Sequence, residues 1–135
     1  MIPAMELMKP DLSFWHTMTE LISTHALIID RPKGSPHPRY ADLIYPLDYG
    51  YLENTSAGDG DGIDVWLGSL NKVIDRGNLK TLTGILCTFD TLKRDAEIKL
   101  LIGCNNEDIQ VIRDFLKDMH TLYIPNPVVE RDLSN

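Results

Sequence analysis

The chain has 135 residues, of which 43% are hydrophobic, so it is large enough to bury one core and is expected to form a single domain over 1–135. Its formal net charge of −7 argues against binding to the phosphate backbone of nucleic acids and suits a protein that binds cations. The first ten residues, MIPAMELMKP, lack the long apolar segment of a secretory signal, and no run approaches the length of a membrane span. The two cysteines are far apart in the sequence, as expected for reduced thiols. We therefore expect a cytoplasmic protein without nucleic-acid or membrane partners.

The N-terminal third is predicted to contain a helix, a strand and a loop. Residues 12–23 place apolar side chains at helical spacing, and Asp11 or Ser13 can cap the first turn. The short apolar run 24–30 is predicted to form a buried strand. Residues 31–39 contain three prolines and one glycine, a composition that predicts a loop.

Four further strands are predicted in the middle of the chain. Residues 47–53 are rich in aromatic side chains, and Gly50 marks a bulge or the close approach of another backbone. Residues 62–68, 81–89 and 97–103 are apolar runs of strand length. The last two are expected to pair across the loop DTLKRDA.

The clearest helix is predicted over 105–119, where apolar residues line one face and Asn105 or Asn106 can cap the start. The tail from Tyr123 onward contains two prolines and is predicted to be irregular. The strands lie between one early and one late helix, without the alternating helices of a parallel α/β sheet. The pattern predicts an α+β, mainly β fold: a small closed β-barrel with an N-terminal and a C-terminal helix.

Three aspartates within six residues raise the main question about function. The stretch SAGDGDGIDVW contains Asp59, Asp61 and Asp64, and two like charges about 4 Å apart cost on the order of 4 kcal/mol at an effective dielectric constant of about 20. A solvated turn is the simplest interpretation, because Asp and Gly favour turns. A calcium EF-hand does not fit, because a loop starting at Asp59 has Ile63 at its fifth position and Leu70 where a bidentate Glu is required.

A magnesium site fits the aspartates better, because Mg²⁺ prefers carboxylates, water and substrate phosphates as ligands. Asp59 and Asp61 would share one face of an extended segment, and a bend at the following glycine would bring Asp64 beside them. A second acidic pair, Asp90 and Asp95, flanks the loop between the two long strands. Two acidic clusters near a Tyr-Gly-Tyr segment together indicate a site for divalent cations.

The segment YPLDYGYLENTSAGDGDGIDVWLG, residues 45–68, resembles the signature of the soluble inorganic pyrophosphatases, an Mg²⁺-dependent family with an OB-like β-barrel. The likeness extends upstream through IIDRPKGSPHPRY and downstream through DTLKRDA. It implies that several Mg²⁺ ions, with Mn²⁺ as an alternative ion, bind between the aspartates and diphosphate. It further implies that a metal-activated water attacks one phosphorus, and that the protein is a homo-oligomer with diphosphate as its small-molecule substrate.

The resemblance implies a role for each matching residue. Asp61 would act as general base or orient the attacking water, and the hydroxyl of Tyr49 would contact phosphate. Arg39 stands where the family has a phosphate-binding lysine, and Lys117 remains from a Tyr-Lys pair that also binds phosphate. The implied metal ligands are Asp59, Asp64, Asp90, Asp95 and, at an outer metal, Asp30.

The first departures from the family lie ahead of the Tyr-Gly-Tyr segment. Ala41 replaces an outer carboxylate, and the short segment 40–45 lacks a hairpin that carries a phosphate-binding arginine. Arg31 and Lys33, in the proline-rich loop, are candidates to supply the missing positive charge.

Two further departures lie downstream. Glu97 stands in place of a phosphate-binding lysine, but Lys99, two residues on, is expected to share its strand face. Leu116 replaces the tyrosine that precedes Lys117. The acidic part of the site is therefore complete, while the phosphate-binding part is thinned.

Three functions are compatible with this sequence. The first is Mg²⁺-dependent hydrolysis of inorganic diphosphate. The second is hydrolysis of another phosphoanhydride, such as a nucleotide or a modified diphosphate, by the same mechanism, because the shortened segment 40–45 would open the site to a larger group. The third is non-catalytic binding of metal or phosphate on the same scaffold. The intact set of aspartates argues against the third.

Overall fold

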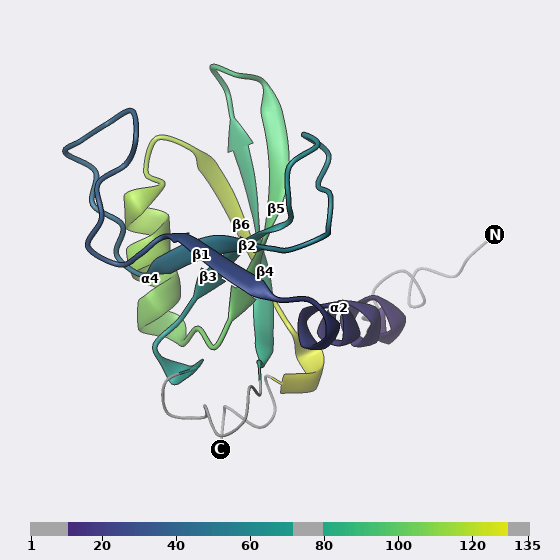
Figure 1. The fold of residues 1–135 in the computed structure, drawn as a ribbon. Helices are drawn as coiled ribbons and strands as arrows, with labels where there is room; N and C mark the ends of the chain where they lie inside the picture. Colours follow the sequence, from purple (N-terminus) through teal and green to yellow (C-terminus); the bar gives the residue numbers. More distant parts are fainter. Residues whose placement is uncertain (1–10, 72–79, 130–135) are drawn as a thin grey trace.

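The computed structural model describes residues 11–71 and 80–129; the segment MIPAMELMKP and the last six residues of the tail are among those outside this description. Figure 1 shows the arrangement of the elements, with α2 and α4 far apart on the sheet. In chain order they are α2 (Leu12–Thr24), β1 (Leu27–Arg31), β2 (Asp48–Leu52), β3 (Asp64–Leu67), β4 (Leu82–Asp90), β5 (Asp95–Ile102), α4 (Asn106–Phe115) and β6 (His120–Pro125).

Six strands form one sheet in the order β1-β2-β3-β5-β4-β6. Neighbouring strands are antiparallel except β3 and β5, which pair in parallel. The predicted antiparallel pairing of the two long strands, β4 and β5, is confirmed. The predicted mainly β fold with flanking helices is also confirmed. The predicted closed barrel is not confirmed, because within the described residues the sheet ends at β1 and β6, which do not pair with each other.

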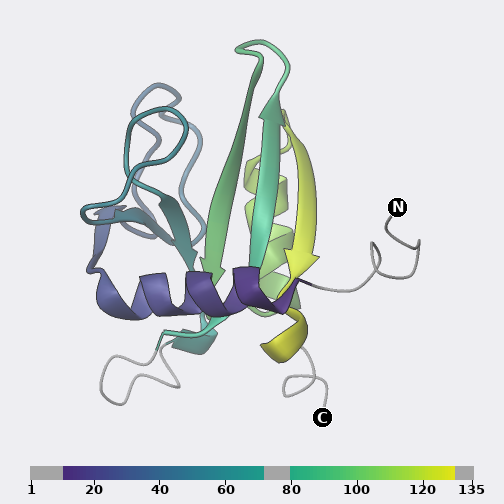
Figure 2. The same ribbon diagram turned by 90° about the vertical axis from the view of Figure 1, so that its right-hand side faces the viewer.

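The sheet separates two apolar cores, because successive side chains of a strand point to opposite faces. Along β5, Leu100 packs with α2 and Leu101 packs with α4. The core beneath α2 contains the helix residues Trp15 and Ile22. The core beneath α4 includes Trp66. Figure 2 shows α2 lying across the lower end of the strands, so the upper part of the β4–β5 hairpin extends beyond it.

Both helices begin at the predicted caps. The side chain of Asp11 accepts hydrogen bonds from the backbone N–H groups of Ser13 and Phe14, at 3.1 and 3.4 Å. Asn105 accepts from the Asp108 N–H at 2.8 Å, and Asp108 accepts in return from the Asn105 N–H at 2.9 Å. These side chains satisfy N–H groups that have no partner inside the helix. No described helix is long and apolar enough to cross a membrane.

The prediction of an irregular tail is wrong for its first part. The chain from His120 to Pro125 forms β6, which pairs antiparallel with β4 along the outer side of the sheet. Proline is tolerated here because Pro125 ends an edge strand, where a missing N–H interrupts no central ladder. The predicted close approach at Gly50 is confirmed: a Cβ at this position would lie 1.8 Å from the carbonyl oxygen of Ile28.

Candidate active site

The connection between β2 and β3 presents the first acidic cluster to solvent. Its turn is closed by a hydrogen bond from the Gly60 N–H to the Ala57 carbonyl at 2.9 Å, and Gly60 has φ +90°, a conformation that favours glycine. A carboxylate oxygen of Asp59 accepts from the Asp61 N–H at 3.0 Å. The Asp61 carboxylate has no hydrogen bond or ion pair within the described part of the chain and is exposed. Its oxygens are therefore available to water or a cation.

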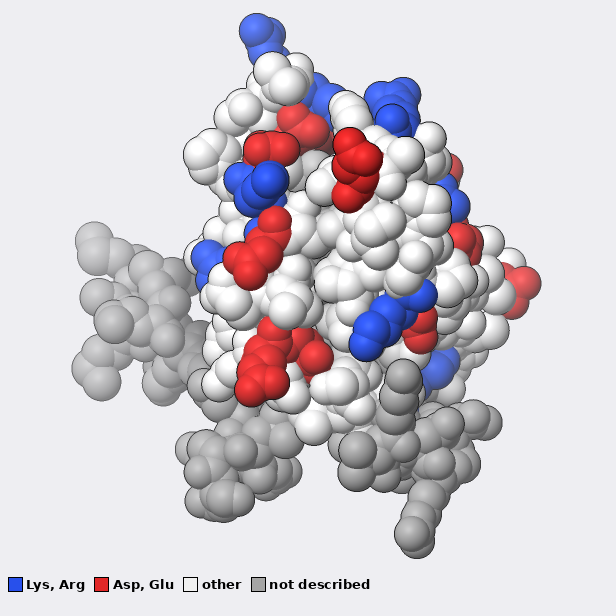
Figure 3. Space-filling view, turned by 90° about the vertical axis from the view of Figure 1, so that its left-hand side faces the viewer, with Lys and Arg blue, Asp and Glu red and all other residues white. Residues whose placement is uncertain are grey.

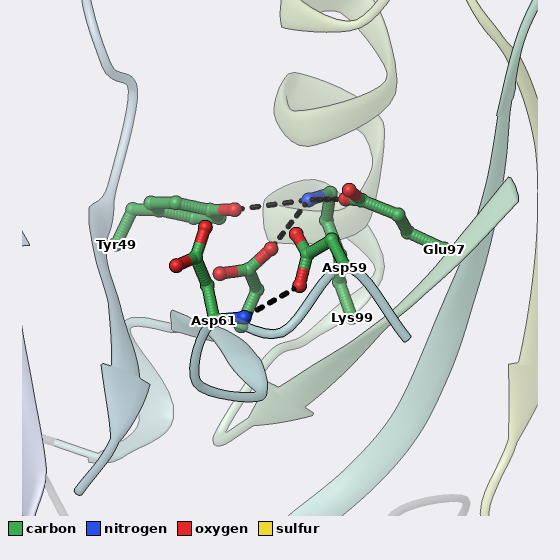
Figure 4. Close-up of polar contacts among 6 residues, drawn as sticks. Tyr49, Asp59, Asp61, Glu97 and Lys99 are labelled. Carbon is green, nitrogen blue, oxygen red and sulfur yellow. Dashed lines mark hydrogen bonds and ion pairs between the residues drawn. The ribbon is translucent and has the colours of Figure 1, made fainter. Parts of the chain in front are cut away.

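Lys99 lies at the centre of the site. Its ammonium donates to the Tyr49 hydroxyl at 2.9 Å, to Asp64 at 3.1 Å and to Glu97 at 3.0 Å. The side chain is only 9% exposed. Figure 4 shows Asp59 and Asp61 on the loop beside this group of contacts, with Tyr49 and Glu97 on opposite sides of the ammonium. Three different strands, β2, β3 and β5, thus meet at one cation.

Lys99 and Tyr49 each influence the pKa of the other. Burial is the largest influence on Tyr49 and raises the pKa of its hydroxyl, so the phenol is neutral at neutral pH. Burial acts to lower the pKa of Lys99, but Tyr49, Asp64 and Glu97 outweigh it and the pKa is raised. The site therefore contains a charged ammonium next to a protonated phenol, and the three N–H groups of the ammonium are directed at Tyr49, Asp64 and Glu97.

Aromatic packing fixes the position of Tyr49. Its ring centroid lies 4.7 Å from that of Trp66, in an edge-to-face arrangement, and 5.6 Å from that of Tyr45. Burial raises the pKa of the Tyr45 hydroxyl, and the positive charge of Arg31 counteracts this rise. These ring contacts fix the direction in which the Tyr49 hydroxyl points.

The second acidic pair occupies one end of the β4–β5 hairpin. Asp90 and Asp95 are directly opposite each other in the register. One Asp90 oxygen also accepts from the N–H groups of Leu92 and Lys93, at 2.9 and 3.1 Å, which holds the hairpin turn. By strand alternation Asp95 lies on the same face of β5 as Glu97 and Lys99. The strand β5 therefore carries both Asp95 of the second acidic pair and Lys99, which contacts Asp64 of the first cluster.

Asp30 and the remaining expected phosphate ligands lie farther along the chain. Asp30 is the extra residue of a β-bulge in β1, between Ile29 and Arg31, and its carboxylate lies 3.9 Å from the Arg31 guanidinium. Arg39 and Lys33 are exposed in the loop between β1 and β2, and Lys117 is exposed just after α4. None of these last three side chains makes a hydrogen bond or ion pair to the residues that the structure describes, so their expected roles stay predictions.

A group of positive charges surrounds His37. Its pKa is lowered, first by burial and then by Arg31, Lys93 and Arg39. These residues come from β1, the β4–β5 hairpin and the loop between β1 and β2, so the fold gathers them from distant parts of the sequence. Figure 3 shows basic and acidic side chains close together on the upper part of the face that it views. Lys93 was not among the expected phosphate ligands, because no local pattern distinguishes it from an ordinary hairpin lysine.

The donor set fits a hard divalent cation in chemistry, although the ligands are not yet gathered. The aspartates offer carboxylate oxygens, which Mg²⁺ prefers. Among the described residues, no three acidic, histidine or cysteine side chains lie close enough together to hold an ion as they stand. One Asp64 oxygen is occupied by Lys99. An ion would therefore have to draw the exposed carboxylates of Asp59 and Asp61 inward.

Comparison with solved structures identifies the class of fold. The chain is similar to an inorganic pyrophosphatase from Coxiella burnetii, with a TM-score of 0.50 and 14% sequence identity over 73% of this chain and 82% of that one. At this level of identity the likeness concerns the fold alone.

The sequence comparisons then identify the family. The model of the inorganic pyrophosphatase family matches residues 22–126, so the chain belongs to the inorganic pyrophosphatase family. Inorganic pyrophosphatases of Geobacillus stearothermophilus and Bacillus sp. (strain PS3) are each 37% identical to it over 70 residues, which cover 51% of this chain and 41% of each relative. The matched part thus spans about two fifths of the length of these relatives.

Proposed function

We propose that this protein hydrolyses inorganic diphosphate to two phosphates in a reaction that requires Mg²⁺. The observation that carries the proposal is the meeting of an exposed aspartate loop with a buried, positively charged lysine and a neutral tyrosine. One part of such a site suits cations and the other suits phosphate oxygens. Membership of the pyrophosphatase family supports this reading of the geometry.

The carboxylates would hold the metal ions. Asp59 lies on the β2–β3 loop, Asp64 begins β3, Asp90 and Asp95 face each other across the hairpin, and Asp30 lies apart on the bulge of β1. Bound Mg²⁺ would lower the pKa of a coordinated water and neutralise charge on the phosphates. Binding would also relieve the repulsion among the aspartates.

Asp61 is the residue proposed to act on the attacking water. Its carboxylate has no partner in the described structure, so it can accept the water proton as the oxygen attacks phosphorus. The bond between that phosphorus and the bridging oxygen breaks, and two phosphates result. Tyr49 is protonated and can donate a hydrogen bond to a phosphate oxygen, and Lys99 could do the same once a metal ion took Asp64 from it.

Additional positive charge would come from the group around His37. Arg31, Arg39 and Lys93 provide it together, whereas the family hairpin in this region is missing. Lys33 and Lys117 stay predicted phosphate ligands. The cytoplasmic location, Mn²⁺ as an alternative ion and a homo-oligomeric state also stay predictions.

The first experiment compares phosphate release from diphosphate by the wild type and Asp61→Asn, with millimolar MgCl₂. Loss of the proton acceptor should lower kcat by about 10²- to 10⁴-fold, while the unfolding temperature stays nearly unchanged because the side chain is exposed and unpaired. Asp114→Asn is the matched control: it removes the same charge from an exposed position on α4 and should leave kcat unchanged. Equal activity of Asp61→Asn and wild type would contradict the proposed role.

The non-catalytic alternative makes a different prediction. If the wild type binds Mg²⁺ by calorimetry but releases no phosphate from diphosphate, a binding function or another substrate would replace the proposal.

A further inference from the structure

A cavity of about 710 Å³ opens beside the acidic loop. Phe14 and Met18 of α2 form one side, residues 56–59 of the acidic loop form another, and Cys87 and Ile98 of the paired strands β4 and β5 form a third. Figure 2 shows that α2 covers only the lower end of these strands. The volume lies within the roughly 300–1,000 Å³ that is usual for small-molecule sites.

The cavity has an apolar wall and reaches the candidate active site at the acidic loop. Ile98 and Leu100 lie on the opposite face of β5 from Glu97 and Lys99, so the cavity meets the site beside Asp59 and Asp64 and not on the face that carries Lys99. Its lining includes the apolar residues Phe14, Met18, Ile63, Cys87, Ile98 and Leu100. Four acidic residues of the site also line it, namely Asp59, Asp64, Asp95 and Glu97. Phe14 and Ile98 remain 37% and 49% exposed. Inorganic diphosphate has no apolar part that could use such a wall.

We propose that the site accepts diphosphate esters of an apolar alkyl or aryl group. The inference rests on the proposed function, because Mg²⁺ at the aspartates would be needed to hold the diphosphate end. The organic group would lie in the cavity against Met18 and Ile98. A nucleoside fits less well, because Ser56 and Thr88 are the only uncharged hydroxyl or amide side chains among the described residues that line this cavity, and a base needs several hydrogen-bond partners.

The reaction on such an ester is the same hydrolysis. Water adds to the terminal phosphorus and gives its proton to Asp61, and the bond from that phosphorus to the bridging oxygen breaks. The organic monophosphate leaves with the bridging oxygen, and phosphate is the second product. The thinned set of phosphate ligands is then offset by the apolar contacts of the organic group.

The test compares methyl and hexyl esters of methylenediphosphonate, which cannot be hydrolysed, by calorimetry in MgCl₂. Each buried methylene should tighten binding by up to about four-fold, so the hexyl ester should bind at least about ten-fold more tightly than the methyl ester. Ile98→Asn should reduce this ratio several-fold without a comparable loss for the methyl ester. Leu122→Asn is the matched control, since Leu122 is exposed on β6 outside the cavity, and it should preserve the ratio.

Cys87 reports the position of the bound group. It is partly exposed and lines the cavity, whereas Cys104 is buried. The hexyl ester should slow the alkylation of Cys87 by iodoacetamide, and the methyl ester should not. If the two esters bind equally and neither protects Cys87, the inference is wrong, even if inorganic diphosphate is hydrolysed. If the hexyl ester binds tightly and protects Cys87 but inorganic diphosphate is not cleaved, the cavity assignment holds and the proposed function fails.

Discussion

Lys99 shows how a single residue can hold together a site built from repelling charges. Its ammonium contacts Asp64 and Glu97 and donates to the Tyr49 hydroxyl, so it supplies the positive charge that offsets these carboxylates. Glu97 alone would have added to the negative charge. Lys99, two residues further along β5, lies on the same face of the strand and offsets the negative charge of Glu97.

Replacing this lysine should therefore make the protein depend more on metal. Lys99→Met should lower the free energy of unfolding by about 1–2 kcal/mol, toward the low end for charged hydrogen bonds because its carboxylate partners are partly solvated. The unfolding temperature, measured with and without MgCl₂, should rise more on Mg²⁺ addition in Lys99→Met than in the wild type, because the ion can neutralise Asp64 and Glu97. Lys93→Met, an exposed lysine of the β4–β5 hairpin, controls for net charge. An equal Mg²⁺ response in all three proteins would show that Lys99 does not act as this counter-charge.

His37 offers a direct measurement of phosphate binding. Arg31, Lys93 and Arg39 contribute to its lowered pKa, so an anion that neutralises them should raise the pKa and favour the charged imidazole. NMR titration of the His37 ring signal, assigned by its loss in His37→Gln, should show this upward shift when methylenediphosphonate and MgCl₂ are added. NaCl at matched ionic strength is the control. A shift no larger than that caused by NaCl would argue that phosphate does not bind near this group.

At the scale of elements, sequence patterns predict where strands and helices lie better than they predict which of these elements contact one another. Both helix caps and the pairing of β4 with β5 are local features, and they were predicted. The strand β6 was missed, because Pro125 at its end and Pro127 just after it suggested irregular structure, and its pairing with β4 is not visible in the sequence. The parallel pairing of β3 with β5, which brings Asp64 to Lys99, also joins distant segments and follows from the fold alone.

The N-terminus of α4 depends on one buried carboxylate. Asp108 accepts from the Asn105 N–H and from the N–H and hydroxyl of Ser69, at 2.9 to 3.0 Å, so it links the helix to the end of β3. Asp108→Ala would leave two backbone N–H groups without these acceptors and should cost about 2–4 kcal/mol in urea unfolding. Asp114→Ala, an exposed position at the other end of α4, should cost less than about 0.5 kcal/mol. Similar values for the two variants would contradict the importance of this link.

At the scale of the whole molecule, the net charge of −7 is unevenly placed. The candidate site combines the carboxylates of the β2–β3 loop, the β4–β5 hairpin and Glu97 around one buried lysine. Such a site should attract divalent cations more strongly than the average surface does, since nearby charges on one side of a protein reinforce one another. Part of the negative charge seen in the composition is thus located at the candidate site.

Binding of cations at this location should stabilise the folded protein beyond any effect of ionic strength. A ligand that binds only the folded state adds about 2.7 kcal/mol when its free concentration is 100 times its dissociation constant, so millimolar MgCl₂ should raise the unfolding temperature by several degrees. NaCl at the same ionic strength screens charges without occupying the site and should raise it less. The double variant Asp59→Asn/Asp61→Asn should lose the difference between the two salts, whereas Asp114→Asn/Asp118→Asn, with the same change of charge at the exposed end of α4, should keep it. If NaCl and MgCl₂ stabilise the wild type equally, the acidic loop does not bind Mg²⁺ under these conditions, and the proposed reaction loses its metal.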